Sequence, residues 1–239
     1  MTIKLADLYF NVQNKYSAVE NMCKDYICNP PSDAAVYDIS VTDEEILAET
    51  PEYDLQDPQY LEVLAVYRKI CEKLPFNEGY LFHAAVIEVN GIAIAFTARS
   101  GTGKTTHVRL WKKVFGDKVG IINGDKPIIR FADKKPFAFG TPWAGKECFN
   151  RNTSAPLEAI VLLERATENK ITRLSPKEAA NTFLSQIYLP KNDNRLFLQT
   201  LALADATLKC TPVYRLGCNM DDSAAKIAYE GIFAEDLPQ

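Results

Sequence analysis

The sequence is poor in the residues that build metal sites and disulfide frameworks. Only two histidines occur in 239 residues, and no two cysteines form a C-x-x-C pair. Structural zinc sites and disulfide-rich folds depend on such residues at close, regular spacings. We therefore expect no zinc site and reduced, mostly structural thiols. The six cysteines are Cys23, Cys28, Cys71, Cys148, Cys210 and Cys218.

Long apolar runs are also missing. No run approaches the roughly 18 residues of a membrane span, and the first residues, MTIKLADLYF, lack a signal-peptide pattern. We therefore expect no membrane segment and a cytoplasmic protein. Hydrophobic residues make up 47% and charged residues 24% of the chain, which are ordinary globular values. A chain of this length can bury a sizeable core in one or two domains.

Charge is distributed unevenly along the chain, whose net charge is −4. Residues 1–98 hold 6 Lys/Arg against 16 Asp/Glu, and residues 152–239 hold 9 against 11. Residues 99–151 hold 12 against 4, a local excess of +8. Such a local positive field suits a polyanionic ligand, whereas the acidic remainder argues against nucleic acid as a partner. A lysine-rich, solvated surface would explain the same excess.

The first 79 residues are expected to form a small α/β module. Pro58 stands at the first position of one predicted helix, where proline is favoured. The acidic stretch 43–57 is expected to be a surface loop. The predicted strands are 3–12 and 34–41, and the predicted helices are 16–28 and 58–74.

From Tyr80 the pattern changes. Two apolar segments, 80–89 and 92–98, flank Asn90-Gly91, a dipeptide typical of a two-residue β-hairpin turn. Strands joined in this way are antiparallel, so we predict a mixed sheet flanked by helices rather than a purely parallel one. Further predicted strands are 119–123, 127–131, 137–139, 157–163 and 211–218, and further predicted helices are 177–188, 194–209 and 222–233, the last with Asp222 or Ser223 as N-cap.

The stretch SGTGKTT, residues 100–106, has the composition of a phosphate-binding loop. Such a loop needs small residues whose backbone N–H groups converge on phosphate oxygens, a helix N-terminus, a lysine and a hydroxyl for Mg²⁺. An apolar strand precedes it and an amphipathic helix follows. The full motif G-x-x-x-x-G-K-[ST] has a glycine where this chain has Ala98, which is still small. The expected nucleotide-binding residues are Ser100, Gly101, Thr102, Gly103, Lys104, Thr105 and Thr106, with Lys104 on the β/γ-phosphates and Thr105 on the metal.

A carboxylate that could act in catalysis follows the loop in the sequence. Asp125 ends the apolar strand VGIIN-GD, 21 residues after Lys104, where it can hold Mg²⁺ or accept the proton of a substrate hydroxyl. A turn aspartate would fit the local sequence equally well. His83 lies in the hairpin strand that pairs with the strand before the loop, and a tight register would place it near the phosphates. His107 lies in the first turn of the predicted helix, on its surface or at the site.

Residues 139–152, FGTPWAGKECFNRN, form a loop of the kind that commonly lines a pocket. Lys146 or Arg151 could stabilise charge on a transferring phosphoryl group. Trp143 could instead pack beneath the loop.

Together these motifs resemble the nucleotide core shared by HPr kinase/phosphorylase and ATP-dependent phosphoenolpyruvate carboxykinase. The order LFHAA…NG…AFTARSGTGKTTH…IINGDKP carries the resemblance, mainly over residues 80–165. It implies a mixed-sheet P-loop domain at 80–239, after an N-terminal α/β module at 1–79. In that domain Lys104 and Thr105 would bind nucleotide and metal. Asp125 would be the second residue of the family's aspartate pair, and His83 the family histidine near the phosphates.

The chain departs from the family pattern at two places. Gly124 stands where the family has its first aspartate, and GTPWAGKECFN replaces the arginine- and glycine-rich signature of HPr kinases. The chain is also too short for a full carboxykinase. The resemblance is therefore closest to small HPr-kinase-like proteins, a group that includes kinases of serine in peptides.

The sequence thus predicts an ATP- and Mg²⁺-dependent kinase that phosphorylates a hydroxyl group, with serine of a protein or peptide as the expected acceptor. Asp125 would orient or deprotonate the hydroxyl, and Thr105 and Asp125 would hold Mg²⁺. Two other functions stay open. One is a carboxykinase-like transfer to a small molecule. The other is a regulatory module that binds nucleotide without transfer, which is suggested by Gly124 in place of the family's first aspartate. The acceptor, the choice of ATP, GTP or pyrophosphate as donor, and the oligomeric state stay undetermined.

Overall fold

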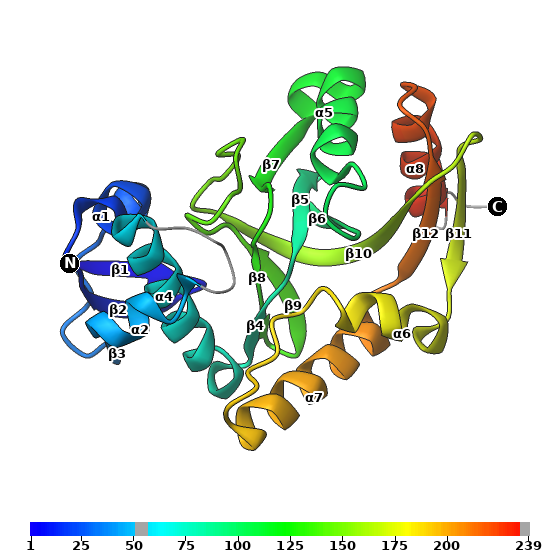
Figure 1. The fold of residues 1–239 in the computed structure, drawn as a ribbon. Coiled ribbons are helices and arrows are strands. Elements are labelled where there is room, and N and C mark those ends of the chain that lie inside the picture. The colour runs from blue at the N-terminus through cyan, green and yellow to red at the C-terminus, as the bar shows by residue number, and fades with distance from the viewer. Residues whose placement is uncertain (51–56, 235–239) are drawn as a thin grey trace.

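Two β-sheets and the helices packed on them make up the described chain, residues 1–50 and 57–234 of the computed structural model (Figure 1). The smaller sheet has three strands in the order β1-β2-β3, and the larger has nine. The fold is therefore α/β. In Figure 1 the small sheet and its helices lie on the left, with the larger sheet and its helices to their right.

The small sheet begins with a hairpin. β1 (Thr2–Leu5) and β2 (Leu8–Gln13) are antiparallel, and β3 (Val36–Ser40) runs parallel to β2. The prediction of one strand over 3–12 is therefore wrong. Ala6 and Asp7 both adopt positive φ, 48° and 59°, and turn the chain between the two strands. Alanine rarely adopts that conformation, so a turn at this position is hard to predict from the residues.

Among the described residues, three helices accompany the small sheet. α1 (Ser17–Cys23) continues into a 3₁₀ turn (Lys24–Tyr26), and α4 (Pro58–Lys73) confirms the predicted helix at 58–74. The prediction of an irregular loop over 43–57 is wrong in its first part, where α2 (Asp43–Leu47) forms. Thr42 and Glu45 cap this helix reciprocally, a pattern that could have been read from the sequence. Residues 51–56 lie outside the described residues.

The predicted hairpin is present in the larger sheet. β5 (Ala84–Val89) and β6 (Ile92–Thr97) are antiparallel, and Asn90 and Gly91 both have positive φ in the turn. The predicted strand 80–89 is, however, interrupted at Phe82 and His83. Its first part, β4 (Gly79–Leu81), pairs with β8 elsewhere in the sheet.

The remaining strands complete a curled, mixed sheet in the order β4-β8-β9-β10-β6-β5-β7, with β12 paired to β10 and β11 to β12. β10 is parallel to both β6 and β12, whereas its first residues pair with β9 in antiparallel fashion. The prediction of a mixed sheet is confirmed, and β11 is a strand that the sequence did not suggest. The bounds are β7 (Val119–Asn123), β8 (Ile128–Ala132), β9 (Lys135–Phe139), β10 (Ser154–Arg165), β11 (Lys170–Leu174) and β12 (Val213–Cys218).

Helices cover both faces of the larger sheet. The alternation of side chains along a strand sends Ala85 and Ile87 to a core with α5 (Lys104–Phe115) and α8 (Ser223–Phe233). It sends Ala84 and Val86 to a second core with α6 (Pro176–Leu184) and α7 (Asn194–Cys210). Short 3₁₀ turns, Pro75–Asn77 and Gly116–Lys118, follow α4 and α5.

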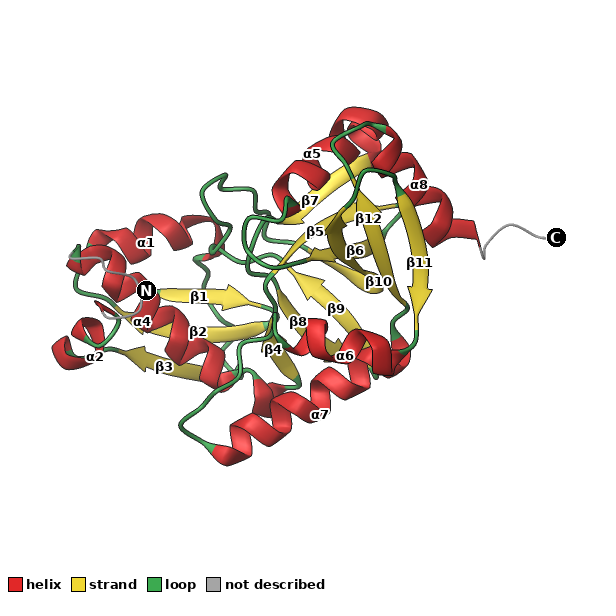
Figure 2. Cartoon of the chain, turned by 45° about the vertical axis from the view of Figure 1, so that its right-hand side comes forward, coloured by secondary structure: helices red, strands yellow, loops and turns green. Residues whose placement is uncertain are grey.

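A third core joins the two sheets. Side chains of β1, β2, α1 and α4 pack in one cluster with Leu81, Ile128, Phe139 and Trp143 of the larger part. Figure 2 shows the small sheet beside β4 and β8, which supply two of these residues. Within residues 1–50 and 57–234, no helix has the length and apolar character needed to span a bilayer.

Candidate phosphate-binding and catalytic site

Strand register brings His83 to the start of the glycine loop (residues 99–103). Ala84 pairs with Thr97 across the β5–β6 hairpin, so His83 lies opposite Ala98. The Thr97 hydroxyl donates to the His83 carbonyl at 2.8 Å. On the other side of β5, Val86 pairs with Asn123, and the Ala84 N–H donates to the Asp125 carbonyl at 3.0 Å. The same strand end therefore meets both the glycine loop and Asp125.

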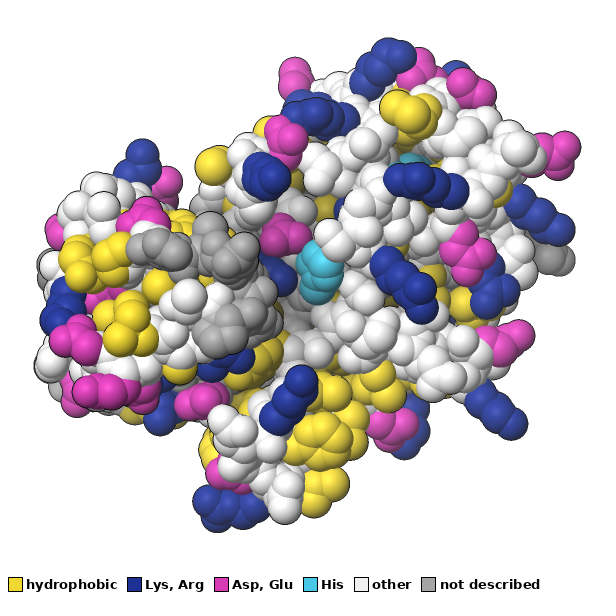
Figure 3. All heavy atoms as spheres, viewed as in Figure 1, with side chains coloured by type: hydrophobic (Ala, Val, Ile, Leu, Met, Phe, Trp, Pro, Cys, Tyr) yellow, Lys and Arg dark blue, Asp and Glu magenta, His cyan; other side chains and the backbone are white. Residues whose placement is uncertain are grey.

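Three ionisable side chains converge at this point. The Nζ atom of Lys104 lies 3.0 Å from Nε2 of His83 and donates to the Ala98 carbonyl at 3.2 Å. His83 Nε2 lies 3.1 Å from Oδ1 of Asp125. Figure 3 shows a histidine (cyan) with acidic and basic side chains beside it in the hollow between the two parts of the molecule. The structure thus brings together three of the residues predicted for catalysis.

His83 can bond only one of its two neighbours through Nε2. An unprotonated Nε2 accepts from the Lys104 ammonium, whereas a protonated Nε2 donates to the Asp125 carboxylate. A ligand that draws Lys104 away would therefore leave His83 free to hold Asp125.

The pKa values of Lys104 and Asp125 reflect this crowding. Burial lowers the pKa of the Lys104 ammonium, although Asp125 acts in the opposite direction. Burial would raise the pKa of Asp125, but the hydrogen bond to His83 and the charges of Lys126 and Lys104 outweigh it and hold this pKa below its ordinary value. Asp125 is therefore a carboxylate at neutral pH.

The glycine loop has the backbone that its sequence predicts. Gly101 and Gly103 have φ of 77° and 124°, a region that glycine adopts without strain. Gly103 is the N-cap of α5, so the free N–H groups of the first turn, which contains Lys104 and Thr105, point toward the loop. The Arg165 guanidinium donates to the carbonyls of Gly101 and Thr102, at 2.5 and 3.4 Å. Arg165 thereby engages loop carbonyls and leaves loop N–H groups for an anion.

Asp125 is held by a turn that the buried Asn123 side chain builds. Its Oδ1 accepts from the backbone N–H groups of Asp125 and Lys126 at 2.9 and 2.7 Å. Its Nδ2 donates to the Thr141 carbonyl at 3.0 Å, and the Thr141 hydroxyl donates to the Lys126 carbonyl at 2.7 Å. Asn123 and Thr141 are positioning residues that the sequence analysis missed, although Asn-Gly-Asp is a recognisable turn signature.

Steric contacts explain why position 124 is a glycine. A Cβ atom at this position would lie 3.0 Å from the Ala144 carbonyl and 3.3 Å from Cβ of Phe149. These contacts belong to the loop 140–151, which also packs on Asp125 at Gly145 and is anchored where Trp143 meets the Tyr67 ring at 4.6 Å. The loop thus fills the space that a side chain at position 124 would need.

We expect the change Gly124→Ala to destabilise the protein. The added methyl group presses on backbone of the loop 140–151, and overpacking of this kind costs about 1–3 kcal/mol. The measurement is the free energy of unfolding in urea. An unchanged or higher stability would mean that the loop yields freely and that the glycine has no steric role.

Of the two basic residues predicted to stabilise the phosphoryl group, Arg151 is held away from the three converging side chains. The Arg151 guanidinium pairs with Glu88 at 2.9 Å and donates to the Ile121 carbonyl, so it lies along β5 and β7 instead. Lys146 is exposed on the loop 140–151. Trp143 is buried and packs against the Tyr67 ring, in agreement with the alternative that it packs beneath the loop.

His107 faces the sheet and not the helix surface. It is 2% exposed and packs against Phe96 and Trp111. Its Nε2 accepts from the Trp111 indole at 3.0 Å, so the proton of the neutral ring lies on Nδ1. Burial lowers the pKa of His107 to about 4, which keeps the ring neutral. Nδ1 has no hydrogen-bond partner among the described residues.

His107 also lines a cavity of about 520 Å³ beside the glycine loop, here called the α5 cavity. Gly101, Gly103 and Thr106 form one side of it, and apolar side chains that include Leu163 and Met220 form another. Met220 is 76% exposed at its rim. The cavity therefore offers an apolar surface that continues directly from the loop.

Comparisons with known proteins place the chain in a family. Residues 46–223 match the family of the SynChlorMet cassette protein ScmC, and the chain belongs to that family. A comparison with curated proteins finds no match. Among solved structures, the chain is similar to the HPr(Ser) kinase/phosphatase from Coxiella burnetii with 8% identity and a TM-score of 0.38, over 66% of this chain and 99% of that one. At that TM-score the likeness supports no statement about function or mechanism.

Proposed function

We propose that this protein is an ATP- and Mg²⁺-dependent kinase that transfers the γ-phosphoryl group to a hydroxyl group, as on serine. One observation carries the proposal. Nε2 of His83 lies 3.0 Å from the Lys104 ammonium and 3.1 Å from the Asp125 carboxylate, directly behind a glycine loop at a helix N-terminus. A cation for phosphate and a carboxylate for a hydroxyl are the groups that phosphoryl transfer needs.

The donor would lie along the glycine loop. Backbone N–H groups of residues 101–106 and the Lys104 ammonium would bind the β- and γ-phosphates, since both act on negative charge at short range. The nucleoside would then extend into the α5 cavity, where Leu163 and Met220 offer apolar contact. In this arrangement a nucleoside triphosphate is favoured over pyrophosphate as donor.

Asp125 would orient the acceptor hydroxyl and take its proton. Its low pKa makes it a weak base, which suits a loose transition state in which the proton leaves late. When the phosphates engage Lys104, His83 would hold the Asp125 carboxylate through Nε2. Lys146 could approach from the exposed loop 140–151, whereas Arg151 would have to leave Glu88 first.

The residues present suit magnesium. Mg²⁺ prefers oxygen donors and is commonly held by one or two protein ligands together with phosphates and water. The Thr105 hydroxyl and the Asp125 carboxylate are such donors, and the Asp125 side chain is 29% exposed. Bound there, Mg²⁺ would neutralise charge on the β- and γ-phosphates.

We also propose that the two parts of the chain have different roles. Residues 80–239 would carry the nucleotide chemistry, and residues 1–79 would contribute α4 as one wall of the hollow beside His83. The Asn123–Thr141 contacts that fix Asp125 lie wholly within the second part.

Calorimetric titration with ATP and with tripolyphosphate, each with and without Mg²⁺, tests the donor site. We expect Mg²⁺-dependent binding of both. In Met220→Ser, ATP should bind about five-fold more weakly, because about 1 kcal/mol of apolar contact with the nucleoside is lost, while tripolyphosphate should bind unchanged.

Leu198→Ser is the matched control, since Leu198 is 63% exposed on α7 and outside the α5 cavity. Failure of both ligands to bind would refute the kinase. Equal weakening of both in Met220→Ser, or no change with ATP, would refute the placement of the nucleoside.

A further inference from the structure

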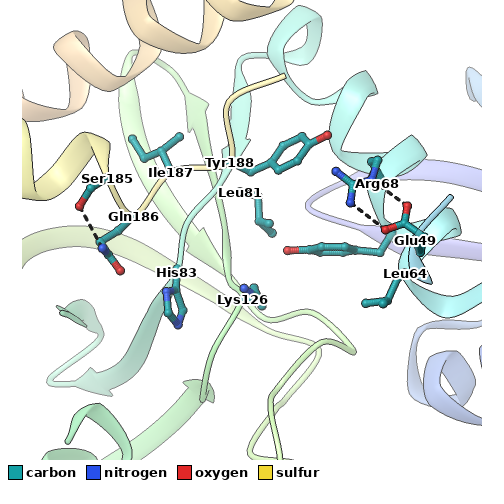
Figure 4. Close-up of a pocket in the computed structure, with 11 residues that line it drawn as sticks. Glu49, Leu64, Arg68, Leu81, His83, Lys126, Ser185, Gln186, Ile187 and Tyr188 are labelled. Atoms are coloured by element: carbon teal, nitrogen blue, oxygen red, sulfur yellow. Dashed lines mark hydrogen bonds and ion pairs between the residues drawn. The ribbon is translucent and has the colours of Figure 1, made fainter. Parts of the chain in front are cut away.

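A second cavity opens on the other side of His83. It lies between α4 and the segment 185–188, which connects α6 toward α7, and its volume is about 220 Å³. Figure 4 shows His83 and Lys126 at one side of this α4 cavity, with Tyr188 and Arg68 across from them. Because His83 also touches Lys104 and Asp125, a ligand in this cavity would lie next to the site of phosphoryl transfer.

The charged groups of the wall favour an anion. Arg68 is held by two hydrogen bonds to Glu49, at 2.8 and 2.7 Å, so these opposite charges compensate each other. Lys126 is half-buried and adds a further positive charge. Among the Lys, Arg, Asp and Glu side chains described at this wall, the balance is therefore positive. A carboxylate or phosphate on the ligand would compensate this positive charge.

The wall also holds an unused hydrogen-bond acceptor. Gln186 is 8% exposed, and its Oε1 has no partner in the described part of the chain. Its Nε2 donates to the Ser185 hydroxyl at 3.0 Å, and its backbone carbonyl accepts from the His83 N–H at 2.8 Å. Through its backbone, Gln186 ties this part of the wall to His83.

The size of the cavity limits the ligand. Its volume is about 220 Å³. Sites for drug-sized ligands start at about 300 Å³. The cavity therefore suits a molecule with few non-hydrogen atoms.

We propose that the α4 cavity is the acceptor site and that its ligand is a small hydroxyl-bearing carboxylate, of the size of serine or glycerate. This assignment rests on the proposed kinase function. It makes the acceptor a small molecule and not a serine within a protein. Lys126 binds the carboxylate. The reacting hydroxyl points past His83 toward Asp125.

The transfer step balances with groups already named. The hydroxyl oxygen attacks the γ-phosphorus of ATP, and a new O–P bond forms. The bond from this phosphorus to the oxygen that bridges the β- and γ-phosphates breaks, and ADP leaves with its electron pair. The hydroxyl proton passes to Asp125 and then to water. The products are a phosphate monoester of the acid, ADP and one proton.

The test compares carboxylates with matched molecules that lack the charge. D-glycerate and L-serine are offered with Mg²⁺ and ATP, beside glyceramide, glycerol and a blocked seryl peptide. Phosphate esters are detected by phosphorus NMR, and binding is measured calorimetrically with a non-transferable ATP analogue. We expect at least one acid to bind and to be phosphorylated, with its amide or alcohol at least ten-fold poorer.

Lys126→Gln should raise the KM of the accepted acid at least ten-fold and remove its advantage over the uncharged molecule, with the Kd of ATP within two-fold of wild type. Lys126→Arg, which keeps the charge, should restore most of the loss and serves as the second variant if the glutamine protein is unstable. Lys135→Gln, an exposed lysine on β9, is the matched control.

Each other outcome overturns the proposal. Binding of ATP with no small acid bound or phosphorylated would refute this acceptor class and leave the kinase standing. Phosphorylation of the blocked peptide alone would assign the acceptor to a polypeptide. An unchanged KM in Lys126→Gln would refute the carboxylate contact. Absence of ATP binding would refute the kinase itself and this site with it.

Discussion

Replacing Lys104 by alanine should abolish phosphoryl transfer, with a loss of at least 10²–10³-fold in kcat. The ammonium lies behind the glycine loop, where it would bind the β- and γ-phosphates and neutralise charge as the γ-phosphoryl group moves. ATP should also bind about 10- to 100-fold more weakly, since a hydrogen bond to a charged group contributes about 1.5–3 kcal/mol. Calorimetry with Mg²⁺-ATP and a phosphate-ester assay measure the two effects.

The fold should tolerate this change. Burial lowers the pKa of Lys104, so burying its charge is itself unfavourable and its removal relieves that cost. The melting temperature should therefore stay close to that of the wild type. Lys113→Ala is the control, because Lys113 lies on the same helix with its side chain 68% exposed and pairs with Asp222 at the surface. Near-full activity in a folded Lys104→Ala protein would contradict the mechanism.

The change Asp125→Asn should remove the contribution of Mg²⁺ to ATP binding. In the wild type, Mg²⁺ should tighten ATP binding at least about ten-fold, and in the variant this gain should largely disappear because one anionic ligand is lost. Turnover should fall by about 10²–10⁴-fold, since the asparagine cannot take the hydroxyl proton. Titrations with and without Mg²⁺ and the same ester assay test both effects.

Asparagine is chosen because it keeps the size of the side chain and leaves the backbone contacts of Asn123 with residues 125 and 126 in place. Asp117→Asn, at a fully exposed aspartate, controls for the change of charge. If ATP binds equally well with and without Mg²⁺ in both wild type and variant, the protein is better described as a nucleotide-binding regulatory module.

The positions of His83 and Asp125 beside the glycine loop could be predicted from the sequence because two local rules determine them. A two-residue Asn90-Gly91 turn fixes the hairpin register, so position 83 has to face position 98 at the start of the loop. An apolar strand that ends in Asn-Gly-Asp places Asp125 at the same sheet edge once β7 pairs with β5. Helices with proline at their start, such as α4 and α6, were predicted for similarly local reasons.

Features that depend on distant contacts were not predicted. Arg151 belongs to the loop expected to line a pocket, yet Glu88 on β5 holds its side chain elsewhere. The role of Arg165 in binding loop carbonyls depends on the parallel pairing of β10 with β6, which no local pattern shows. The α4 cavity likewise combines Arg68 with Gln186, which are 118 residues apart in sequence.

The shared core beneath the small sheet has a consequence for how this chain can evolve. Trp143, Leu81, Ile128 and Phe139 of the larger part fill the same apolar interior as β1, β2 and α4. The N-terminal part thus completes this interior only with side chains of the larger part, which has two further cores of its own. The N-terminal segment is therefore not an interchangeable unit, and recombination between relatives at this boundary would succeed only where the apolar side chains of both halves already matched.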